Sequence, residues 1–349
     1  MKRTCKSAVQ TGGQPPFGRE RINGQFTVTG LERPERLDVY CSKKMPELTR
    51  SRLKTGLRSV RINSAQAKIS RRVHNGDKIE LEWEDPVPHY AAPQNIPLDI
   101  IYENENIIAV NKSAGTVTHP ANGNWDGTLV NALNYYRLFV SPVKDEFSAV
   151  LKKYEALRAQ GEEIPKDKNA DVFRQGIVHR LDKDTSGVII TARTSKTEQF
   201  LKAEFKKRNV KKYYLAVLNG VPKKKCGKIK TAVFRSKGNR KKFSASADVS
   251  KGKTAVSQYR ILKSDGKYSF AVFRIFTGRT HQIRLHAKFI GCPVLGDLVY
   301  GKKNAGFPDS GLMLHAYKLL IDLDGNGSLQ EFKAPLPKKF KAVLRRIGP

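Results

Sequence analysis

The stretch GIVHRLDKDTSGVII, residues 176–190, gathers side chains that could do chemistry beside an apolar, strand-like run. It brings together His179, Arg180, Asp182 and Asp184 and ends its polar part with Thr-Ser-Gly. These residue types suit three structures: a metal-binding loop, a turn without chemistry, or a reactive carboxylate at the edge of a sheet. The rest of the chain must separate the three.

A metal loop is the weakest of these interpretations. The residues from Asp182 imitate the start of a calcium loop, but the position of the closing glutamate holds Arg193, a cation. A second imitation, DLDGNGSLQEFK at residues 322–333, ends on a lysine between strand-like runs, so we predict a hairpin turn there. His281 and His286 are five positions apart and lack the glutamate of a zinc-binding helix. We therefore expect no metal ion.

A turn explains the Asp-Thr-Ser that follows Lys183, since these side chains bond to nearby backbone N–H groups. It explains Asp182 less well, because a buried acid at the start of an apolar run needs a cationic partner. Candidate partners are Arg180, Arg279 and Arg284. Arg284 stands in a second polar cluster, TGRTHQIRLH, and a cation within a few ångströms would keep the carboxylate ionised.

The charge of the chain points to a polyanionic partner. Lys and Arg number 65 against 32 Asp and Glu, which gives a net charge of +33. Residues 206–242 contain no acid at all, and Tyr213, Tyr214, Phe234 and Phe243 lie within or beside that stretch. Cations interleaved with aromatic rings suit nucleic acid, so we predict a folded wall that faces RNA.

Cysteine and hydropathy patterns indicate where the protein works. The four cysteines are far apart and form no CxxC pair, which argues against a disulfide framework and for a reducing compartment. No apolar run reaches the roughly 18 residues of a membrane span, and the basic N-terminus lacks an apolar signal core. We expect a cytoplasmic protein with no membrane contact, although the acid-free residues 1–18 leave an organellar transit peptide open.

The chain divides by composition into a tail, a small unit, a linker and a large unit. We expect residues 1–33 to be a disordered basic tail and residues 34–84 to be a small α/β domain. Residues 85–98 contain four prolines and read as a linker. Residues 99–345 hold most of the strand-like runs, with a charged helical stretch that we interpret as a surface insertion over about 137–172.

The second helix of the small domain carries a row of cations. Thr49 is a plausible N-cap, and Arg50, Arg52, Lys54 and Arg58 follow at roughly helical spacing, so that one face could contact phosphates. Taken alone, such a row is more often only a solvated helix face.

Several motifs resemble a known family in order along the chain. HRLDKDTSG resembles the signature of the RluA/RluD-type RNA pseudouridine synthases. IIYENENIIAVNKSAGTVTHP, GTLVNAL, KYYLAVLNG, TGRTHQIRLHAKFIGCPVLGDLVYG and LMLHAYKLLI resemble its other segments. Ser113 departs from the family pattern, which usually has proline there. Residues 34–84 resemble the S4 RNA-binding module through RLD, TRSRL, VRIN and NGDKIEL.

The resemblance implies a fold and a set of site residues. The fold would be α+β, with a mixed, mainly antiparallel sheet in the catalytic domain beside the small S4-like domain. Asp182 would be the catalytic aspartate, and Arg284 would be its basic partner. Tyr214 would be the active-site tyrosine, with Tyr213 as the fallback assignment.

Further residues would contact the substrate. His179 and Arg180 would shape the catalytic loop, and Ile283 and Leu285 would wall the uridine pocket. In the S4-like domain, the cations that would grip RNA are Arg50, Arg52 and Lys54.

The implied activity is the isomerisation of uridines in structured RNA to pseudouridine, which needs no cofactor. Asp182 would attack C1′ or C6, or would remove the 2′ proton, and the sequence leaves these versions open. Large-subunit ribosomal RNA is the expected substrate, with transfer RNA as an alternative. Other hypotheses are a non-catalytic ribosome assembly factor and a phosphodiesterase using His179 and Asp182. We expect a monomer with no obligate protein partner.

Overall fold

The computed structural model describes residues 21–347 except for 47, 85–90, 122, 144, 161, 163–175, 237, 239–241, 303 and 305. By its internal contacts the chain forms two units, one of residues 1–92 and 152–172 and one of residues 93–151 and 173–349. The first division falls inside the predicted linker. Of that linker, residues 85–90 lie outside the described part, and residues 91–98 form neither helix nor strand.

The smaller unit is an antiparallel sheet covered by two short helices. Its strands are β1 (Arg21–Thr27), β2 (Glu35–Arg36), β3 (Leu57–Ile62), β4 (Ala65–Gln66), β5 (Arg72–Val73) and β6 (Lys78–Glu84). Its helices are α1 (Leu37–Lys44) and α2 (Arg50–Gly56). The main sheet has the order β1-β6-β3-β4, and β2 pairs with β5. The sequence predicts two helices in this unit and a strand over residues 78–83, and the structure confirms all three, with β6 one residue longer.

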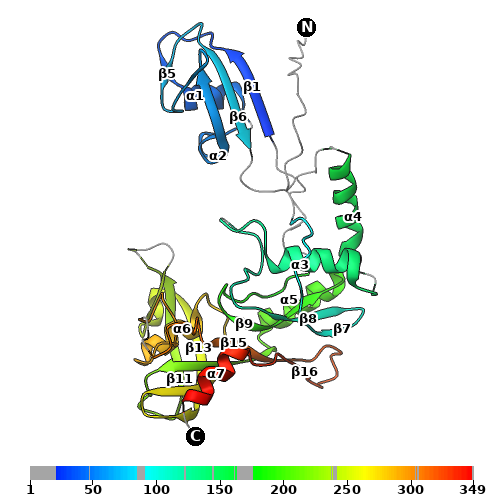
Figure 1. Cartoon of the computed structure of the whole chain (residues 1–349), viewed down its shortest axis with the longest axis vertical. Coiled ribbons are helices and arrows are strands. Elements are labelled where there is room, and N and C mark those ends of the chain that lie inside the picture. The colour runs from blue at the N-terminus through cyan, green and yellow to red at the C-terminus, as the bar shows by residue number, and fades with distance from the viewer. Residues whose placement is uncertain are drawn as a thin grey trace. The chain divides into compact units, whose positions relative to one another are not determined.

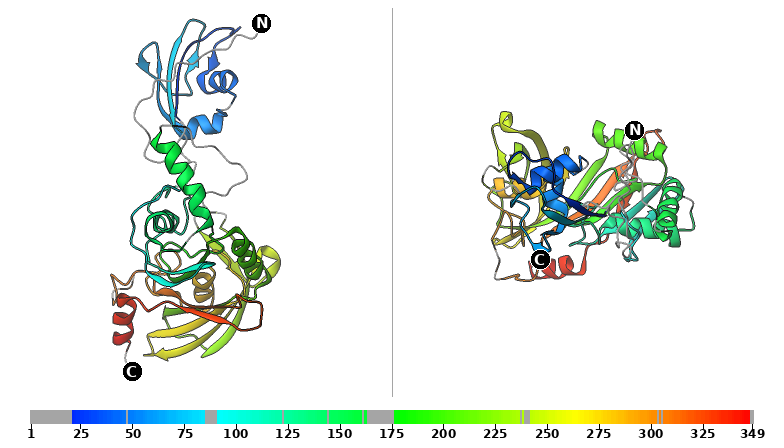
Figure 2. Two further views of the ribbon diagram at one scale, coloured as in Figure 1. Left: turned by 90° about the vertical axis from the view of Figure 1, so that its right-hand side faces the viewer. Right: turned by 90° about the horizontal axis from the view of Figure 1, so that it is seen from above.

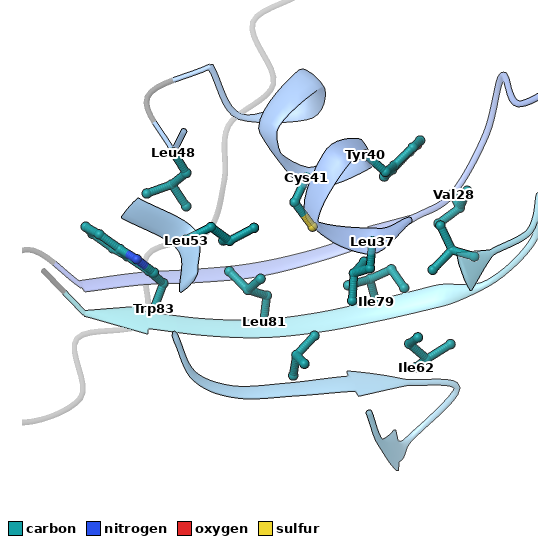
Figure 3. Packing of buried hydrophobic residues seen from close by; sticks show 12 residues of the cluster. Val28, Leu37, Tyr40, Cys41, Leu48, Leu53, Ile62, Ile79, Leu81 and Trp83 are labelled. Carbon is teal, nitrogen blue, oxygen red and sulfur yellow. The ribbon is translucent and has the colours of Figure 1, made fainter. Parts of the chain in front are cut away.

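Alternation along β6 builds the core of this unit. Ile79, Leu81 and Trp83 point inward, where they meet Leu37 of α1 and Leu53 of α2, as Figure 3 shows. The indole N–H of Trp83 donates a hydrogen bond of 2.8 Å to the carbonyl oxygen of residue 52. The strand therefore fixes both helices through one row of side chains.

The prediction that residues 1–33 form a disordered tail is wrong for the second part of that range. Residues 1–20 lie outside the described part of the chain, but Arg21–Thr27 form β1, which pairs with β6 along its whole length. Ile22 and Phe26 pack against the core, and Val28 is fully buried. Residues 22–27 alternate between half-buried and exposed, which is the pattern of a half-buried strand.

The larger unit is built on one mixed sheet. Its strands are β7 (Ile100–Glu103), β8 (Ile107–Lys112), β9 (Ser186–Ala192), β10 (Lys211–Asn219), β11 (Cys226–Arg235), β12 (Phe243–Ser246), β13 (Lys253–Ser264), β14 (Tyr268–Ile275), β15 (Leu314–Ile321) and β16 (Gln330–Lys333). The order is β12-β11-β13-β14-β10-β15-β9-β8-β7, with β16 also paired to β15. Only the β15/β9 contact is parallel among these described pairings, so the predicted mixed, mainly antiparallel sheet is confirmed (Figure 1).

Helices flank this sheet. They are α3 (Leu129–Tyr135), which continues into a π-helical turn at Tyr136–Val140, then α5 (Ser195–Lys207), α6 (Gln282–Phe289) and α7 (Lys338–Arg346), with a 3-10 turn at Val249–Lys251. Helix α4 (Glu146–Ala159) belongs to both units, because the division between them falls after residue 151. Thr128 and Asn131 cap α3 reciprocally through a capping box. Within the described residues no helix is long and apolar enough to cross a bilayer.

The central strands carry the core, as their sequence predicts. Every residue of β9 is buried, and Val188 and Ile190 pack with Ile107 and Ala109 of β8 and with Leu201 of α5. The predicted hairpin turn after β15 is also confirmed, because β15 pairs with β16 and the side chain of Asp322 accepts the intervening backbone N–H groups.

The predicted surface insertion over 137–172 is wrong at its start. Arg137 and Asp145 have fully buried side chains 3.0 Å apart, and the buried Arg193 lies 3.6 Å from the same carboxylate. Buried charges persist when they pair, so the charged residues that suggested a surface here fill an interior instead. Residues 163–172 of the prediction lie outside the described part of the chain.

Candidate active site

The loop that carries Asp182 is held by the segment that follows β8. Lys112 is almost fully buried, and its ammonium group donates hydrogen bonds to the carbonyl oxygens of Ser113, Thr116 and Lys183 at 2.8, 2.8 and 3.0 Å. Burial lowers the pKa of Lys112 to about 8. The two segments are thereby fixed to each other at the residue that follows Asp182, shortly before β9 begins.

The predicted turn after Asp182 is present. The N–H of Thr185 donates to the carbonyl oxygen of Asp182 at 3.1 Å, and β9 begins at the next residue. The turn and the strand start together fix the backbone that carries the Asp182 carboxylate.

Asp182 lies in a pocket of about 100 Å³ between distant parts of the chain. The other lining residues include Tyr214 of β10, Ile275 of β14 and Arg284 of α6. The order of the strands explains why Asp182 and Tyr214 line the same pocket. Tyr214 pairs with residue 316 of β15, which in turn pairs with Gly187 of β9. Strands far apart in sequence are thus neighbours at the pocket.

Arg284 lies near Asp182, as expected, but its direct partner is a residue that the sequence analysis missed. Nη1 of Arg284 is 3.9 Å from Oδ2 of Asp182. Nε and Nη2 each donate a hydrogen bond of 2.7 Å to the two carboxylate oxygens of Asp297. Asp297 also accepts backbone N–H bonds from Val299 and Tyr300. The guanidinium is therefore held in one orientation by Asp297.

Burial and hydrogen bonding shift the pKa values of Arg284 and Asp297 in opposite directions. Burial alone would lower the pKa of Arg284 and raise that of Asp297. The hydrogen bonds between them prevail, so the pKa of Arg284 is raised and that of Asp297 is lowered. Both groups stay charged near neutral pH, and Arg284 presents a permanent cation to Asp182.

His281 is a second residue that sequence reasoning gave no role. Its Nε2 lies 4.0 Å from Oδ2 of Asp182, and its Nδ1 lies 2.7 Å from the hydroxyl of Tyr300. Its backbone is left-handed, with φ of 56°, an uncommon conformation for a residue with a side chain. Burial lowers the pKa of His281, which favours a neutral imidazole beside the carboxylate.

The structure brings Tyr214, and not Tyr213, into the pocket. Tyr214 is 9% exposed, whereas Tyr213 points to the other face of the sheet. Burial, and to a smaller extent the charge of Asp182, raises the pKa of Tyr214. The phenol therefore stays protonated at neutral pH.

The remaining predicted pocket residues differ in whether they line the pocket. Arg180 and Ile283 line the pocket. His179 does not: its Nε2 accepts the N–H of Ile190 at 3.0 Å, and its ring stacks on Phe205. Burial lowers the pKa of His179 to about 3, so it shapes the loop as a neutral side chain.

The prediction that Leu285 walls the pocket is wrong. Residues two apart on a helix point in nearly opposite directions, so Ile283 and Leu285 face different sides of α6. Leu285 packs instead with Val233, Ala255 and Tyr300.

The predicted row of cations in the smaller unit is shorter than expected. Arg50 forms an ion pair of 2.9 Å with Asp38, and the guanidinium of Arg52 lies over the Trp83 ring at 4.9 Å. Lys54 is exposed. Arg58 is not part of the row, because α2 ends at residue 56 and Arg58 belongs to β3.

Comparison with known proteins identifies the family. The model of the RNA pseudouridylate synthase family matches residues 106–289, a range that contains Asp182, Tyr214, His281 and Arg284. The chain belongs to this family. It is an RNA pseudouridine synthase, an isomerase that acts on RNA.

Curated relatives extend the similarity over most of the enzyme. It is 37% identical to a ribosomal large subunit pseudouridine synthase D of Borreliella burgdorferi, over 93% of this chain and 92% of that protein. It is 34% identical to the protein of the same name from Pseudomonas aeruginosa, over 89% and 91%. The predicted RluA/RluD-type resemblance is thereby confirmed.

A solved structure agrees on the fold of the catalytic unit. Human RNA pseudouridylate synthase domain containing 1 superposes with a TM-score of 0.50 at 25% identity, over 70% of this chain and 85% of that one. Among the described residues of the enzyme, no group of three or more His, Cys, Asp or Glu is placed to hold a metal ion.

Proposed function

We propose that this enzyme converts specific uridines of large-subunit ribosomal RNA into pseudouridine, with Asp182 as the catalytic carboxylate. The observation that carries the proposal is the pocket, in which Asp182 is the one acidic side chain among the described lining residues. The substrate is proposed from relatives whose names refer to the ribosomal large subunit. That substrate would place the enzyme in the cytoplasm, and we expect it to act as a monomer.

The proposed chemistry needs one ionised carboxylate. The N1–C1′ bond of uridine breaks, the uracil turns within the pocket, and C5 joins C1′. Asp182 either attacks C1′ or C6 as a nucleophile or removes the 2′ proton as a base, and both roles require the anion. Arg284, held by Asp297, presents its cation 3.9 Å from the Asp182 carboxylate.

Tyr214 and His281 complete the proposed site. A target uridine must leave its stack to reach the pocket. The largely buried ring of Tyr214 would stack on the uracil, and its neutral hydroxyl would assist the final loss of the C5 proton. His281 would restrict the position of the Asp182 carboxylate from the side of Tyr300.

We further propose that the smaller unit is an S4-like RNA-binding domain joined to a catalytic domain of about residues 99–345. The exposed Arg50 and Lys54 of α2 and the partly exposed Arg52 support this assignment, because exposed cations on a small rigid unit can contact RNA phosphates.

The test is a pseudouridine map with wild-type protein, Asp182→Asn and Asp184→Asn. Unmodified ribosomal and transfer RNA are incubated with each protein, and carbodiimide adducts are read by primer extension. Asp184 is exposed and two residues away in the same loop, so its substitution is a matched control. We expect stops at particular ribosomal uridines with wild type and Asp184→Asn, and none with Asp182→Asn, which should still bind RNA within about twofold of wild type because phosphate contacts dominate affinity.

Other outcomes are equally informative. Loss of RNA binding in Asp182→Asn in proportion to activity would make Asp182 a structural residue. Stops confined to transfer RNA would overturn the substrate and keep the catalyst. No stops with wild type on either RNA, despite tight binding, would favour the assembly factor.

A further inference from the structure

A second, larger cavity lies along the catalytic sheet away from the pocket. It measures about 510 Å³, against about 100 Å³ for the pocket. The residues that line it include Tyr213 of β10, Lys228 of β11, Gln258 and Arg260 of β13, and Arg274 of β14. We call this set the outer groove.

The outer groove is on the opposite face of the sheet from the active site. Consecutive residues of a strand point to opposite faces. Tyr214 and Ile275 line the pocket, whereas their neighbours Tyr213 and Arg274 line the outer groove. These residues occupy regular antiparallel positions of the β10/β14 pair, so the alternation holds there.

The strands align the groove residues in one row. Lys228 pairs with Gln258, Gln258 with Arg274, and Arg274 with Tyr213. Tyr213 in turn pairs with Lys318 of β15. Strands β13 and β14 lie side by side in yellow in the left view of Figure 2. With neighbouring strands about 4.8 Å apart, the row crosses about 19 Å of sheet.

The groove cations lie away from the acidic side chains that the structure describes. Within the described part of the chain, no carboxylate lies within ion-pair distance of Lys228, Arg260 or Arg274, whereas Lys318 at the end of the row pairs with Glu331 at 3.0 Å. Lys228 and Arg260 are exposed, and the guanidinium of Arg274 lies 4.7 Å from the centre of the Phe276 ring. Uncompensated cations on adjacent strands repel one another, and a polyanion removes that repulsion.

We propose that the outer groove binds a single-stranded segment of RNA remote from the uridine that is modified. Arg260, Arg274 and Lys228 would contact successive phosphates, since guanidinium groups match phosphate geometry. Gln258 and the half-buried Tyr213 offer an amide and a ring to an unpaired base. A shallow row across several strands suits an extended polymer better than one flipped base. The proposal does not depend on the catalytic role of Asp182.

The first test compares two charge reversals of equal size in the full-length enzyme. Lys228→Glu/Arg260→Glu changes the groove, and Lys196→Glu/Lys339→Glu changes two exposed lysines, one of α5 and one of α7. The probe is a fluorescent single-stranded RNA of about 12 nucleotides, a length typical of such sites, with its anisotropy followed at several salt concentrations. We expect the groove variant to bind about tenfold more weakly, with a salt slope reduced by about 2, and the control to change less than about threefold.

Measurements of activity and of folding distinguish a loss of RNA binding in the groove from general damage to the enzyme. The groove variant should keep its kcat on saturating substrate RNA and its urea midpoint, because both side chains are exposed. Lys228→Gln/Arg260→Gln should give a smaller loss in the same direction. Equal losses in the groove and control variants would overturn the proposal, since affinity would then follow net charge alone. Unchanged RNA affinity in the groove variant would also overturn it and would favour an acidic protein segment as the occupant.

A second test maps the contact directly. The same RNA with 4-thiouridine is photo-cross-linked to the enzyme, and modified residues are assigned by mass spectrometry. We expect cross-links at residues 226–228 or 258–260, which lie on strands that do not contribute to the pocket. Cross-links confined to pocket residues or to the smaller unit would overturn the proposal.

Discussion

Arg284 connects two carboxylates that differ in what they can do. Asp297 has a fully buried side chain and takes both donors of the guanidinium fork, whereas Asp182 is 21% exposed and is approached by the remaining nitrogen. A bidentate pair fixes orientation as well as charge. Asp297 is therefore a positioning residue that acts through Arg284, and Asp182 keeps oxygen atoms free for a substrate.

Asp297→Asn should slow catalysis without weakening RNA binding. Loss of the second charge-assisted bond lets Arg284 shift, and a displacement of about 1 Å can cost about 100-fold in rate. We expect kcat to fall between about tenfold and 100-fold, with RNA affinity within about twofold. Breaking the buried pair should also cost about 3 kcal/mol of unfolding free energy.

Single-turnover kinetics and urea unfolding would check this prediction. The control is Asp309→Asn, the same chemical change at an exposed position. A variant with normal kcat and reduced stability would contradict a positioning role, because Asp297 would then serve the fold alone.

At the scale of elements, the parallel contact between β9 and β15 decides where the catalytic loop sits. Gly187 pairs with residue 316 and has φ of 118°, in the region that favours glycine. A Cβ at this position would lie against the backbone of Ala316, which cannot move without opening the sheet. The glycine of the HRLDKDTSG motif is therefore required by strand packing, five residues after Asp182.

Gly187→Ala should damage both the fold and the activity. The clash and the backbone conformation together should cost more than about 3 kcal/mol, and β9 should shift relative to β15. The control is Gly291→Ala, which has a similar left-handed backbone, with φ of 79°, but open space around the added Cβ. That control should cost only about 1 kcal/mol. Thermal unfolding and pseudouridine formation check both variants, and equal effects would rule out the steric explanation.

At the scale of the molecule, burial keeps His179, His286 and His315 of the larger unit neutral. Burial lowers the pKa of His179 to about 3, and that of His286 and His315 to about 4 each. His286 bonds the hydroxyls of Thr231 and Ser257, and His315 bonds Ser186 and a backbone carbonyl. The neutral form of each imidazole, with a single N–H, satisfies these hydrogen bonds.

Stability should fall as the pH drops from about 6.5 to about 4. An unfolded histidine titrates near 6.5, so over this range the unfolded chain takes up protons that the folded chain excludes. Each histidine contributes up to about 1.4 kcal/mol per pH unit, and this contribution is complete above the unfolded pKa. Urea unfolding across this pH range measures the slope.

His286→Gln provides the control for the pH prediction. It should be less stable than wild type at pH 7, and its slope should be smaller by up to about 1.4 kcal/mol per pH unit, because one buried group no longer titrates. An unfolding free energy that is equal at pH 5 and pH 7 in the wild type would contradict the prediction.

The sequence by itself determined local secondary structure and the loop that carries the candidate catalytic residue. Apolar runs and alternation predicted the central strands, and the acidic loop between HRL and an apolar strand selected Asp182. The lone acid between Asp265 and Asp309 is Asp297, a signal that was available but was not used. The predictions of a disordered tail at β1 and of a surface insertion at residues 137–145 were wrong, because composition does not reveal whether a side chain is buried against a partner.

Only the tertiary structure decided which side chains from different strands and helices contact one another. The bidentate bond between Arg284 and Asp297, the left-handed backbone that turns His281 toward Asp182, and the choice of face for Tyr214 and Leu285 depend on strand order and helix phase. A one-residue change in phase reverses the face of a side chain, and spacing alone cannot set that phase. The outer groove has the same origin, since its row of residues exists only once separate strands are in register.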